Sequence, residues 1–251
     1  MARKKSNGFN GNNGNGNGSV ELVLEKNFVS KLDTNLYGKK VKIKCKNQHQ
    51  KEFLNMIDEK DIVLCSGPAG CGKSHLSIAK ALEYIQTPDN GYNKIYIITP
   101  TVEITRSGVG FLPGTFADKV SVYMNSVYKL FDKIISKEIC DKLLKNQIIE
   151  ILGLGYIRGE NLDNSILIVE ESQNISIKEM LTILTRIGEN CKLIISGDLF
   201  QIDAFRCIED SGLYHSMKKL KDIEGIGIFE FSEDDIVRNS IITEILKRYY
   251  L

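Results

Sequence analysis

The sequence predicts an α/β fold, built as a mostly parallel β-sheet with helices on both of its faces. Short runs of aliphatic residues, such as "ILIV" at 166–169, alternate with longer segments whose apolar residues recur at helical spacing. Strands that are apolar throughout are typical of a parallel sheet, because helices cover both of its faces. The 251 residues suffice for one such domain and are short for two, and no internal repeat divides them.

Five aliphatic runs are expected to form the strands of the sheet. They are rich in isoleucine, leucine and valine, which favour strands. In chain order the expected strands are 61–66, 94–100, 165–171, 191–198 and 223–232. Residues 20–32 predict a further short strand or a mixed segment.

The segments between these runs carry apolar residues on one face, which predicts amphipathic helices. In the first of them, Phe53 and Ile57 share a face. In the second, Leu76, Ala79 and Leu82 do the same. The expected helices are 47–57, 73–85, 136–152, 177–187 and 240–250, with a short strand running into a helix over 118–135.

Residues 1–19 are rich in glycine and asparagine and almost free of apolar side chains. Such a segment cannot bury enough surface to offset the entropy lost on ordering. We therefore expect a flexible tail over 1–19 and one globular domain over 20–251. The basic triplet at 3–5 is interpreted as part of a solubilising end, with contact to a phosphate backbone as the alternative.

The composition argues against several classes of protein. The formal net charge of +1 disfavours a protein held to nucleic acid by charge alone, while a local basic patch is compatible with it. No apolar run has the length of a membrane helix, and no apolar stretch follows the basic N-terminus as in a secretory signal. The six cysteines lack CxxC spacing, which disfavours zinc and disulfides and favours a cytoplasmic location.

The strongest functional signal is "GPAGCGKS" at 67–74, between a predicted strand and a predicted helix. It fits the phosphate-loop pattern G-x-x-x-x-G-K-[ST], in which glycines let backbone N–H groups wrap a phosphate chain at a helix N-terminus. Lys73 is expected to reach the β- and γ-phosphates, and Ser74 to ligate Mg²⁺. The loop residues expected to bind the nucleotide are Gly67, Pro68, Ala69, Gly70, Cys71, Gly72, Lys73, Ser74 and His75.

Two carboxylates follow the aliphatic run at 166–169, where side chains leave the carboxyl edge of a parallel sheet. Glu170 is expected to hold Mg²⁺ through water, and Glu171 to orient or deprotonate the attacking water. The alternative is a solvated pair of glutamates at a strand end. The phosphate loop in the same chain favours the catalytic interpretation.

Two further stretches carry candidate residues. In "GDLFQID" at 197–203, Gln201 is expected to sense the γ-phosphate, because an amide both donates and accepts hydrogen bonds. Asp198 and Asp203 are interpreted either as part of this site or as ordinary helix-cap and turn residues. In "VRNS" at 237–240, Arg238 is a candidate to stabilise charge on the transferring phosphoryl group, with an exposed arginine at a helix start as the alternative.

Together these segments resemble the PhoH family, ATP-binding proteins of bacteria and their phages, over residues 47–250. The resemblance is carried by "NQHQ", "GPAGCGKS", "GFLPG", "VEESQN", "GDLFQID" and "VRNS". It implies a single RecA-like P-loop NTPase domain, similar to the core of superfamily 1 helicases, with ATP and Mg²⁺ as cofactors. It implies also that Gln50 reads adenine, and that Arg158 contacts nucleic acid or a neighbouring subunit.

One departure from the family pattern bears on catalysis. The family usually has an aspartate where this chain has Glu170. The extra methylene moves the carboxylate by roughly 1.5 Å, and Mg²⁺ demands near-ideal geometry. An acid that acts through water would tolerate this shift, whereas a demanding Mg²⁺ geometry would not. In the second case, nucleotide binding is expected to survive and hydrolysis to be slow.

The resemblance implies a homo-oligomer, with a hexameric ring as its expected form. One RecA-like half leaves the phosphates open, and a neighbouring subunit would supply Arg238 to the nucleotide. Three uses of the ATPase compete: translocation or unwinding of single-stranded RNA or DNA, a nucleotide-dependent switch without unwinding, and, least favoured, a ribonuclease-associated activity. No membrane partner is expected.

Overall fold

The computed structural model describes residues 40–99, 128–154, 157 and 162–238, together with positions 241, 242, 244, 245 and 248. The chain separates into two units, Met1–Thr34 and Asn35–Leu251, and every described residue lies in the second. The expectations for 1–19 and 20–32, most of 118–135, and Arg158 fall outside the described residues.

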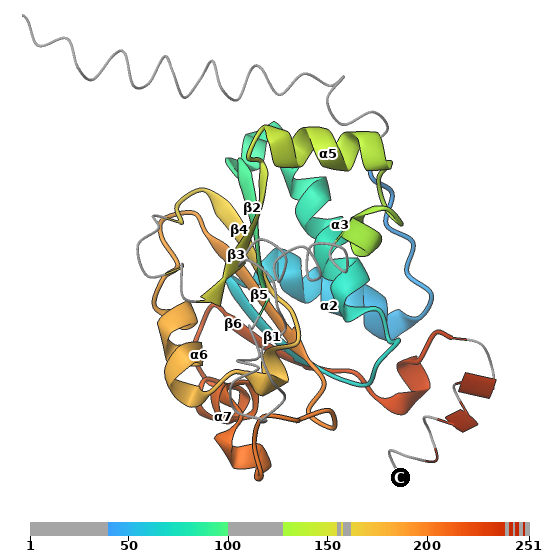
Figure 1. Ribbon diagram of the computed structural model, residues 1–251, viewed down its shortest axis with the longest axis vertical. Coiled ribbons are helices and arrows are strands. Elements are labelled where there is room, and N and C mark those ends of the chain that lie inside the picture. The colour runs from blue at the N-terminus through green and yellow to red at the C-terminus, as the bar shows by residue number, and fades with distance from the viewer. Residues whose placement is uncertain are drawn as a thin grey trace, which may run out of the picture. The chain divides into compact units, whose positions relative to one another are not determined.

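Six parallel strands form one sheet, in the order β3-β2-β4-β5-β1-β6 (Figure 1). The strands are β1 (Ile62–Ser66), β2 (Lys94–Thr99), β3 (Ile149–Gly153), β4 (Ser165–Val169), β5 (Lys192–Gly197) and β6 (Ile226–Glu230). The order places β5 between β1 and β4, so that the carboxyl ends of these three strands are adjacent. This is the predicted α/β architecture of a RecA-like P-loop domain.

Helices cover both faces of the sheet, as the sequence predicts (Figure 1). On one side lie α2 (Gln48–Glu59), α3 (Lys73–Ile85) and α5 (Lys137–Lys145), and on the other α6 (Ile177–Leu184) and α7 (Gly212–Lys219). Alternate strand residues serve the two faces. Leu64, Leu167 and Leu193 belong to the core beneath α6 and α7, to which Met180 and Met217 contribute.

The helix starts follow from local chemistry. Asn47 caps α2, because its side chain accepts a hydrogen bond from the backbone N–H of Gln50. Ser176 and Glu179 form a capping box at the start of α6. Each device satisfies backbone N–H groups that have no partner inside the helix.

The predicted helix over 136–152 is wrong in its second half. The helix α5 ends at Lys145, Gln147 takes a positive φ of 56° in the turn that follows, and β3 begins at Ile149. The apolar residues of this segment fit a helical spacing, but Ile149 and Ile151 also alternate with Glu150 as in a strand. Pairing with β2 at the sheet edge decides between the two patterns.

Helix α7 is not among the helices that the sequence predicts. It spans eight residues, and its buried apolar side chains are Leu213 and Met217, one helical turn apart. A segment this short carries little periodic signal. The described positions between 241 and 248 are helical, in agreement with the helix expected there.

Candidate active site

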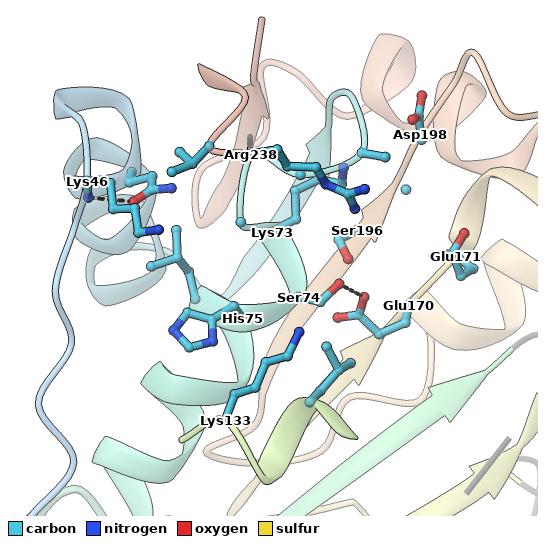
Figure 2. Close-up of a pocket in the computed structure, with 18 of the residues that line it drawn as sticks. Lys46, Lys73, Ser74, His75, Lys133, Glu170, Glu171, Ser196, Asp198 and Arg238 are labelled. Atoms are coloured by element: carbon cyan, nitrogen blue, oxygen red, sulfur yellow. Dashed lines mark hydrogen bonds between the residues drawn. The ribbon is translucent and has the colours of Figure 1, made fainter. Parts of the chain in front are cut away.

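A cavity of about 480 Å³ opens at the carboxyl edge of the sheet (Figure 2). The residues that follow β1, β4 and β5 line its floor, and the segments around 44–50 and 237–238 line its walls. Of the residues predicted for the site, Gln50, Lys73, Ser74, Glu170, Glu171, Gln201 and Arg238 all line this cavity, with the loop residues Ala69, Gly70, Gly72 and His75.

The loop between β1 and α3 has the backbone that a phosphate cradle needs. Gly72 is the N-cap of α3 and adopts a left-handed conformation with φ 101°, which favours glycine. A side chain there would also approach within 2.9 Å of the Gln50 amide nitrogen. The helix N-terminus after Gly72 directs its backbone N–H groups and its positive dipole end toward the cavity.

The Lys73 ammonium is held on its own loop. Its Nζ donates to the carbonyl oxygens of Gly67, at 2.6 Å, and Pro68, at 2.9 Å. Both acceptors belong to the cradle, so the cation lies at the mouth of the loop, where a bound phosphate would offer stronger, charged acceptors. The nearby Cys71 thiol is buried, and desolvation raises its pKa although Lys73 opposes the shift, so it is a thiol that fills space.

Glu170 and Ser74 meet across the cavity floor. The Ser74 hydroxyl donates to Oε2 of Glu170, whose side chain is buried (Figure 2). Among the described residues, Oε1 of the same carboxyl is buried without a hydrogen-bond partner. Desolvation raises the Glu170 pKa to about 7, and the neighbouring Glu171 adds to the rise, while Ser74 and Lys73 oppose it.

This pair fits a hard cation. A hydroxyl oxygen and a carboxylate oxygen are the ligands Mg²⁺ prefers, and an unpaired buried carboxyl oxygen is a group that a cation would satisfy. Within the described part of the chain no three His, Cys, Asp or Glu side chains gather as a metal cage. Mg²⁺ would therefore be held by Ser74 and Glu170 together with phosphate oxygens and water, as is usual at phosphoryl-transfer sites.

Glu171 belongs to a network of amides and carboxylates. It has a left-handed backbone with φ 52°, and its exposed carboxylate accepts a hydrogen bond of 2.9 Å from Nε2 of Gln173. The other end of the Gln173 amide accepts from the backbone N–H of Asp198, at 3.1 Å. Asp198 in turn accepts from Nε2 of Gln201, at 3.0 Å. The proposed base and the proposed sensor are thus connected through Gln173.

Gln173 lies in the "VEESQN" segment that carries the family resemblance, but the sequence predicts no role for its side chain. Its side chain is only 2% exposed, and both ends of its amide are used. The position of this amide, two residues after Glu171, is the sequence signal that could have indicated its role. Asp203 differs from the expectation in another way, since its backbone N–H, rather than its exposed carboxylate, ties the loop to Asn174 at 2.9 Å.

Arg238 lies against the phosphate loop of its own chain. A Cβ placed on Gly70 would come within 2.5 Å of the Arg238 Nε, and the backbone N–H of Val237 donates to the Gly70 carbonyl at 3.0 Å. Figure 2 shows the Arg238 side chain beside Lys73, with its guanidinium turned into the cavity. The sequence predicts an Arg238 that serves the nucleotide of a neighbouring subunit, whereas this geometry brings it to the cavity in cis.

Gln50, from α2, hydrogen-bonds to the phosphate loop. Its Nε2 donates to the Cys71 carbonyl at 2.8 Å, and its Oε1 accepts from the backbone N–H of Lys46 at 2.7 Å. With 4% of its surface exposed, the side chain braces the phosphate loop from the α2 side. The adenine-reading role implied by the family resemblance would have to use the remaining N–H and lone pair of the same amide.

Three lysines at the cavity were not predicted. Lys44 and Lys46 precede α2, and Lys133 precedes α5; all three line the cavity, as does His75. The pKa of His75 is lowered by desolvation and by the charges of Lys133 and Lys46, which keeps the imidazole neutral. More cationic than acidic side chains therefore line the cavity, which suits a polyanionic ligand. Scattered lysines give no periodic or motif signal in a sequence.

The raised pKa of Glu170 predicts a pH dependence of stability. A carboxyl whose pKa rises from 4.5 to about 7 on folding contributes its full stability below pH 4.5, and that contribution is lost as the pH rises through about 7. The loss amounts to ~3 kcal/mol. The test is urea unfolding of the metal-free, nucleotide-free protein at a series of pH values. As the pH rises through this range, the free energy of unfolding of the wild type should fall by this amount relative to that of Glu170→Gln. Parallel pH curves for the two proteins would contradict the burial argument.

Within the part of the chain that the structure describes, no helix has both the length and the apolar character to cross a bilayer.

Among solved structures, the chain is similar to the large terminase of a thermophilic bacteriophage, with 11% identity, coverage of 83% of this chain and 51% of that one, and a TM-score of 0.49. It is similar also to Bacteroides Pif1 bound to ssDNA, with 16% identity, coverage of 82% and 46%, and a TM-score of 0.36.

Relatives found by sequence share a higher identity with this chain than these two solved structures do. The PhoH-like protein of Bacillus subtilis (strain 168) is 34% identical over 227 residues, which cover 90% of this chain and 69% of the relative. Protein PhoH of Escherichia coli (strain K12) is 32% identical over 209 residues, which cover 82% and 58%. The chain thus spans about two thirds of the length of these relatives or somewhat less. The family profile described as PhoH-like protein matches residues 42–250, and the chain belongs to the PhoH family.

Proposed function

We propose that this PhoH-family chain binds ATP with Mg²⁺ in the cavity and hydrolyses it. The observation that carries the proposal is the convergence of a phosphate cradle, an acid pair and an arginine on one sheet edge. Lys73 comes from the loop after β1, Glu170 and Glu171 from the end of β4, and Gln201 from the loop after β5. The second glutamate and the Gln201 side chain linked to it through Gln173 favour hydrolysis over binding alone.

The proposed reaction is in-line attack of water on the γ-phosphate. Lys73 neutralises charge on the phosphates, and Arg238, which lies beside Lys73 in Figure 2, stabilises charge on the transferring group. Glu171, exposed at the cavity and oriented by Gln173, accepts the proton of the attacking water. Ser74 and Glu170 would hold Mg²⁺, which would supply charge neutralisation at the phosphates.

Glu170 in place of the usual aspartate is compatible with this scheme. The longer side chain reaches the Ser74 hydroxyl while its backbone stays in register, since its N–H donates to the Ile98 carbonyl at 3.1 Å. The extra methylene is therefore taken up within the cavity floor. This contact supports retention of the metal site rather than its loss.

Two substitutions separate binding from chemistry. Lys73→Ala should abolish binding of ATP, because the cradle loses its only ammonium among residues 67–75. Glu171→Gln should leave binding of a non-cleavable analogue unchanged and lower kcat by about 10²- to 10⁴-fold. Calorimetry measures the first effect and phosphate release the second.

The matched control is Glu224→Gln, an exposed glutamate next to Gly225, whose carbonyl accepts hydrogen bonds from the amino end of β1. It lies at the opposite edge of the sheet and should leave both binding and turnover at wild-type values. Equal turnover in wild type and Glu171→Gln would sink the role assigned to Glu171.

We propose translocation on single-stranded RNA or DNA as the use of this hydrolysis, with a nucleotide-dependent switch as the second candidate. The lysines at 44, 46 and 133 add local positive charge at the cavity that the net charge of +1 conceals. The near-neutral total charge favours the switch, and the family resemblance favours the polymer, with which the local charge is compatible. A ribonuclease-associated activity is least favoured, because among the described residues no three His, Cys, Asp or Glu side chains gather to hold metal ions.

Single-stranded RNA and single-stranded DNA of equal length should each be added to the ATPase assay. We expect one of them to raise kcat several-fold, with the effect weakening as salt increases. Heparin serves as the control, since it is a polyanion without bases. If heparin stimulates equally, the effect is electrostatic only. If no polymer stimulates, the switch becomes the better proposal.

A homo-oligomer, expected as a hexameric ring, is the corresponding proposal for assembly. The sequence predicts that a neighbouring subunit brings Arg238 to the nucleotide. Because Arg238 lies at the cavity of its own chain, that reason for a neighbouring subunit no longer applies, and the ring is supported by the family resemblance alone. Light scattering of the full chain with Mg²⁺ and ATP should give the mass of six chains. A strict monomer with undiminished hydrolysis would be the contrary result.

A further inference from the structure

Asp235 is a buried acid that the proposed reaction does not use. It ends the short helix η5 (Glu233–Asp235) in the segment between β6 and Arg238, and it is 5% exposed. A buried carboxylate is costly unless its lone pairs are satisfied. The hydrogen-bond partners of Asp235 therefore indicate its role.

The carboxylate joins two segments that are far apart in the sequence. Oδ1 accepts from Nδ2 of Asn47 at 3.1 Å, and Oδ2 lies 2.8 Å from Nδ1 of His49. Oδ2 also accepts from the backbone N–H of Ser232 at 2.9 Å and from its hydroxyl at 3.2 Å. Asp235 therefore ties the start of α2 to the segment that leads to Arg238.

These contacts complete a closed circuit around the phosphate loop. Starting at Asp235, the circuit runs through Asn47, which caps the backbone N–H of Gln50 at 2.8 Å, and through the Gln50 amide to the Cys71 carbonyl. It returns from the Gly70 carbonyl to the backbone N–H of Val237. Gln50 bonds to the loop from the α2 side and Val237 from the Arg238 side, and the Asp235 carboxylate links these two segments to each other.

Arg238 has no comparable anchor of its own. Its side chain is exposed and makes no ion pair or hydrogen bond with any residue in the described part of the chain. The contact of its stem with Gly70 and the bond from Val237 are what place it. A long side chain without side-chain partners depends on its backbone for its aim, and a misplacement of about 1 Å can cost up to 10²-fold in rate.

We infer that Asp235 is a positioning residue for Arg238, holding the arginine-bearing segment in register with the phosphate loop through Asn47 and His49. The inference rests on the proposed function, because it assigns Asp235 an effect on turnover that passes through Arg238. The alternative is a carboxylate that only stabilises the fold. The two differ in whether its loss still matters once Arg238 is gone.

The test is a double-mutant cycle in the full chain. Asp235→Asn keeps the shape but places an amide N–H₂ against donors from Asn47 or His49. We expect it to lower kcat for ATP by about tenfold to a hundredfold, with little change in affinity for a non-cleavable analogue. In an Arg238→Ala background the same substitution should have no further effect on kcat. Glu233→Gln, on the same turn, is the control and should leave kcat unchanged.

A second variant guards against loss of folding. Asn47→Ser keeps an efficient N-cap for α2 but is too short to reach Asp235. It should lower kcat by a smaller factor, again only when Arg238 is present.

The outcomes are distinguishable. The positioning role is overturned if the effects of the two substitutions on kcat multiply in the double mutant. It is overturned also if the substitution lowers thermal stability and leaves kcat unchanged. The proposed function stands in both cases. Turnover that is unaffected by Arg238→Ala overturns the role of Arg238 and this inference, while hydrolysis itself stands. Turnover that is absent in the wild type overturns the proposed function and this inference with it.

Discussion

The site depends on one constraint, the parallel direction of all six strands. Every carboxyl end then emerges at the same edge of the sheet, and each strand delivers its next residue to a common place. After β1 comes a glycine-rich loop that exposes N–H groups, after β4 an acid pair, and after β5 an amide and a carboxylate. An antiparallel neighbour would send the same residues to the opposite edge.

Glu170 shows how the fold prepares for a cation. The sheet and α3 remove its carboxyl from water, one oxygen accepts from Ser74, and the other has no partner among the described residues. The burial that raises its pKa to about 7 is an energetic cost to the folded protein. A divalent ion at this point would relieve that cost, so the same burial that weakens the free protein strengthens the attraction for metal.

The phosphate loop is supported from outside as well as by its own glycines. Gln50 holds the middle of the loop through the Cys71 carbonyl, and the segment before Arg238 holds it through the adjacent Gly70 carbonyl. Phe231 packs at the Gly67 end, where an added Cβ would meet it at 2.6 Å. These contacts come from parts of the chain more than 150 residues apart in numbering, from 50 to 231. The loop conformation is therefore a property of the whole domain.

The sequence by itself determined the strands β1, β2, β4, β5 and β6, the phosphate loop, and the acids after β4, because aliphatic runs and glycine spacing are local signals. It did not determine β3, whose apolar residues also fit a helical spacing and which is fixed by pairing with β2, or α7, whose eight residues carry little periodic signal. Nor did it reveal Gln173, the lysines at 44, 46 and 133, or Arg238 reaching the loop of its own chain. Those depend on which distant segments meet at the sheet edge, and only tertiary structure decides that.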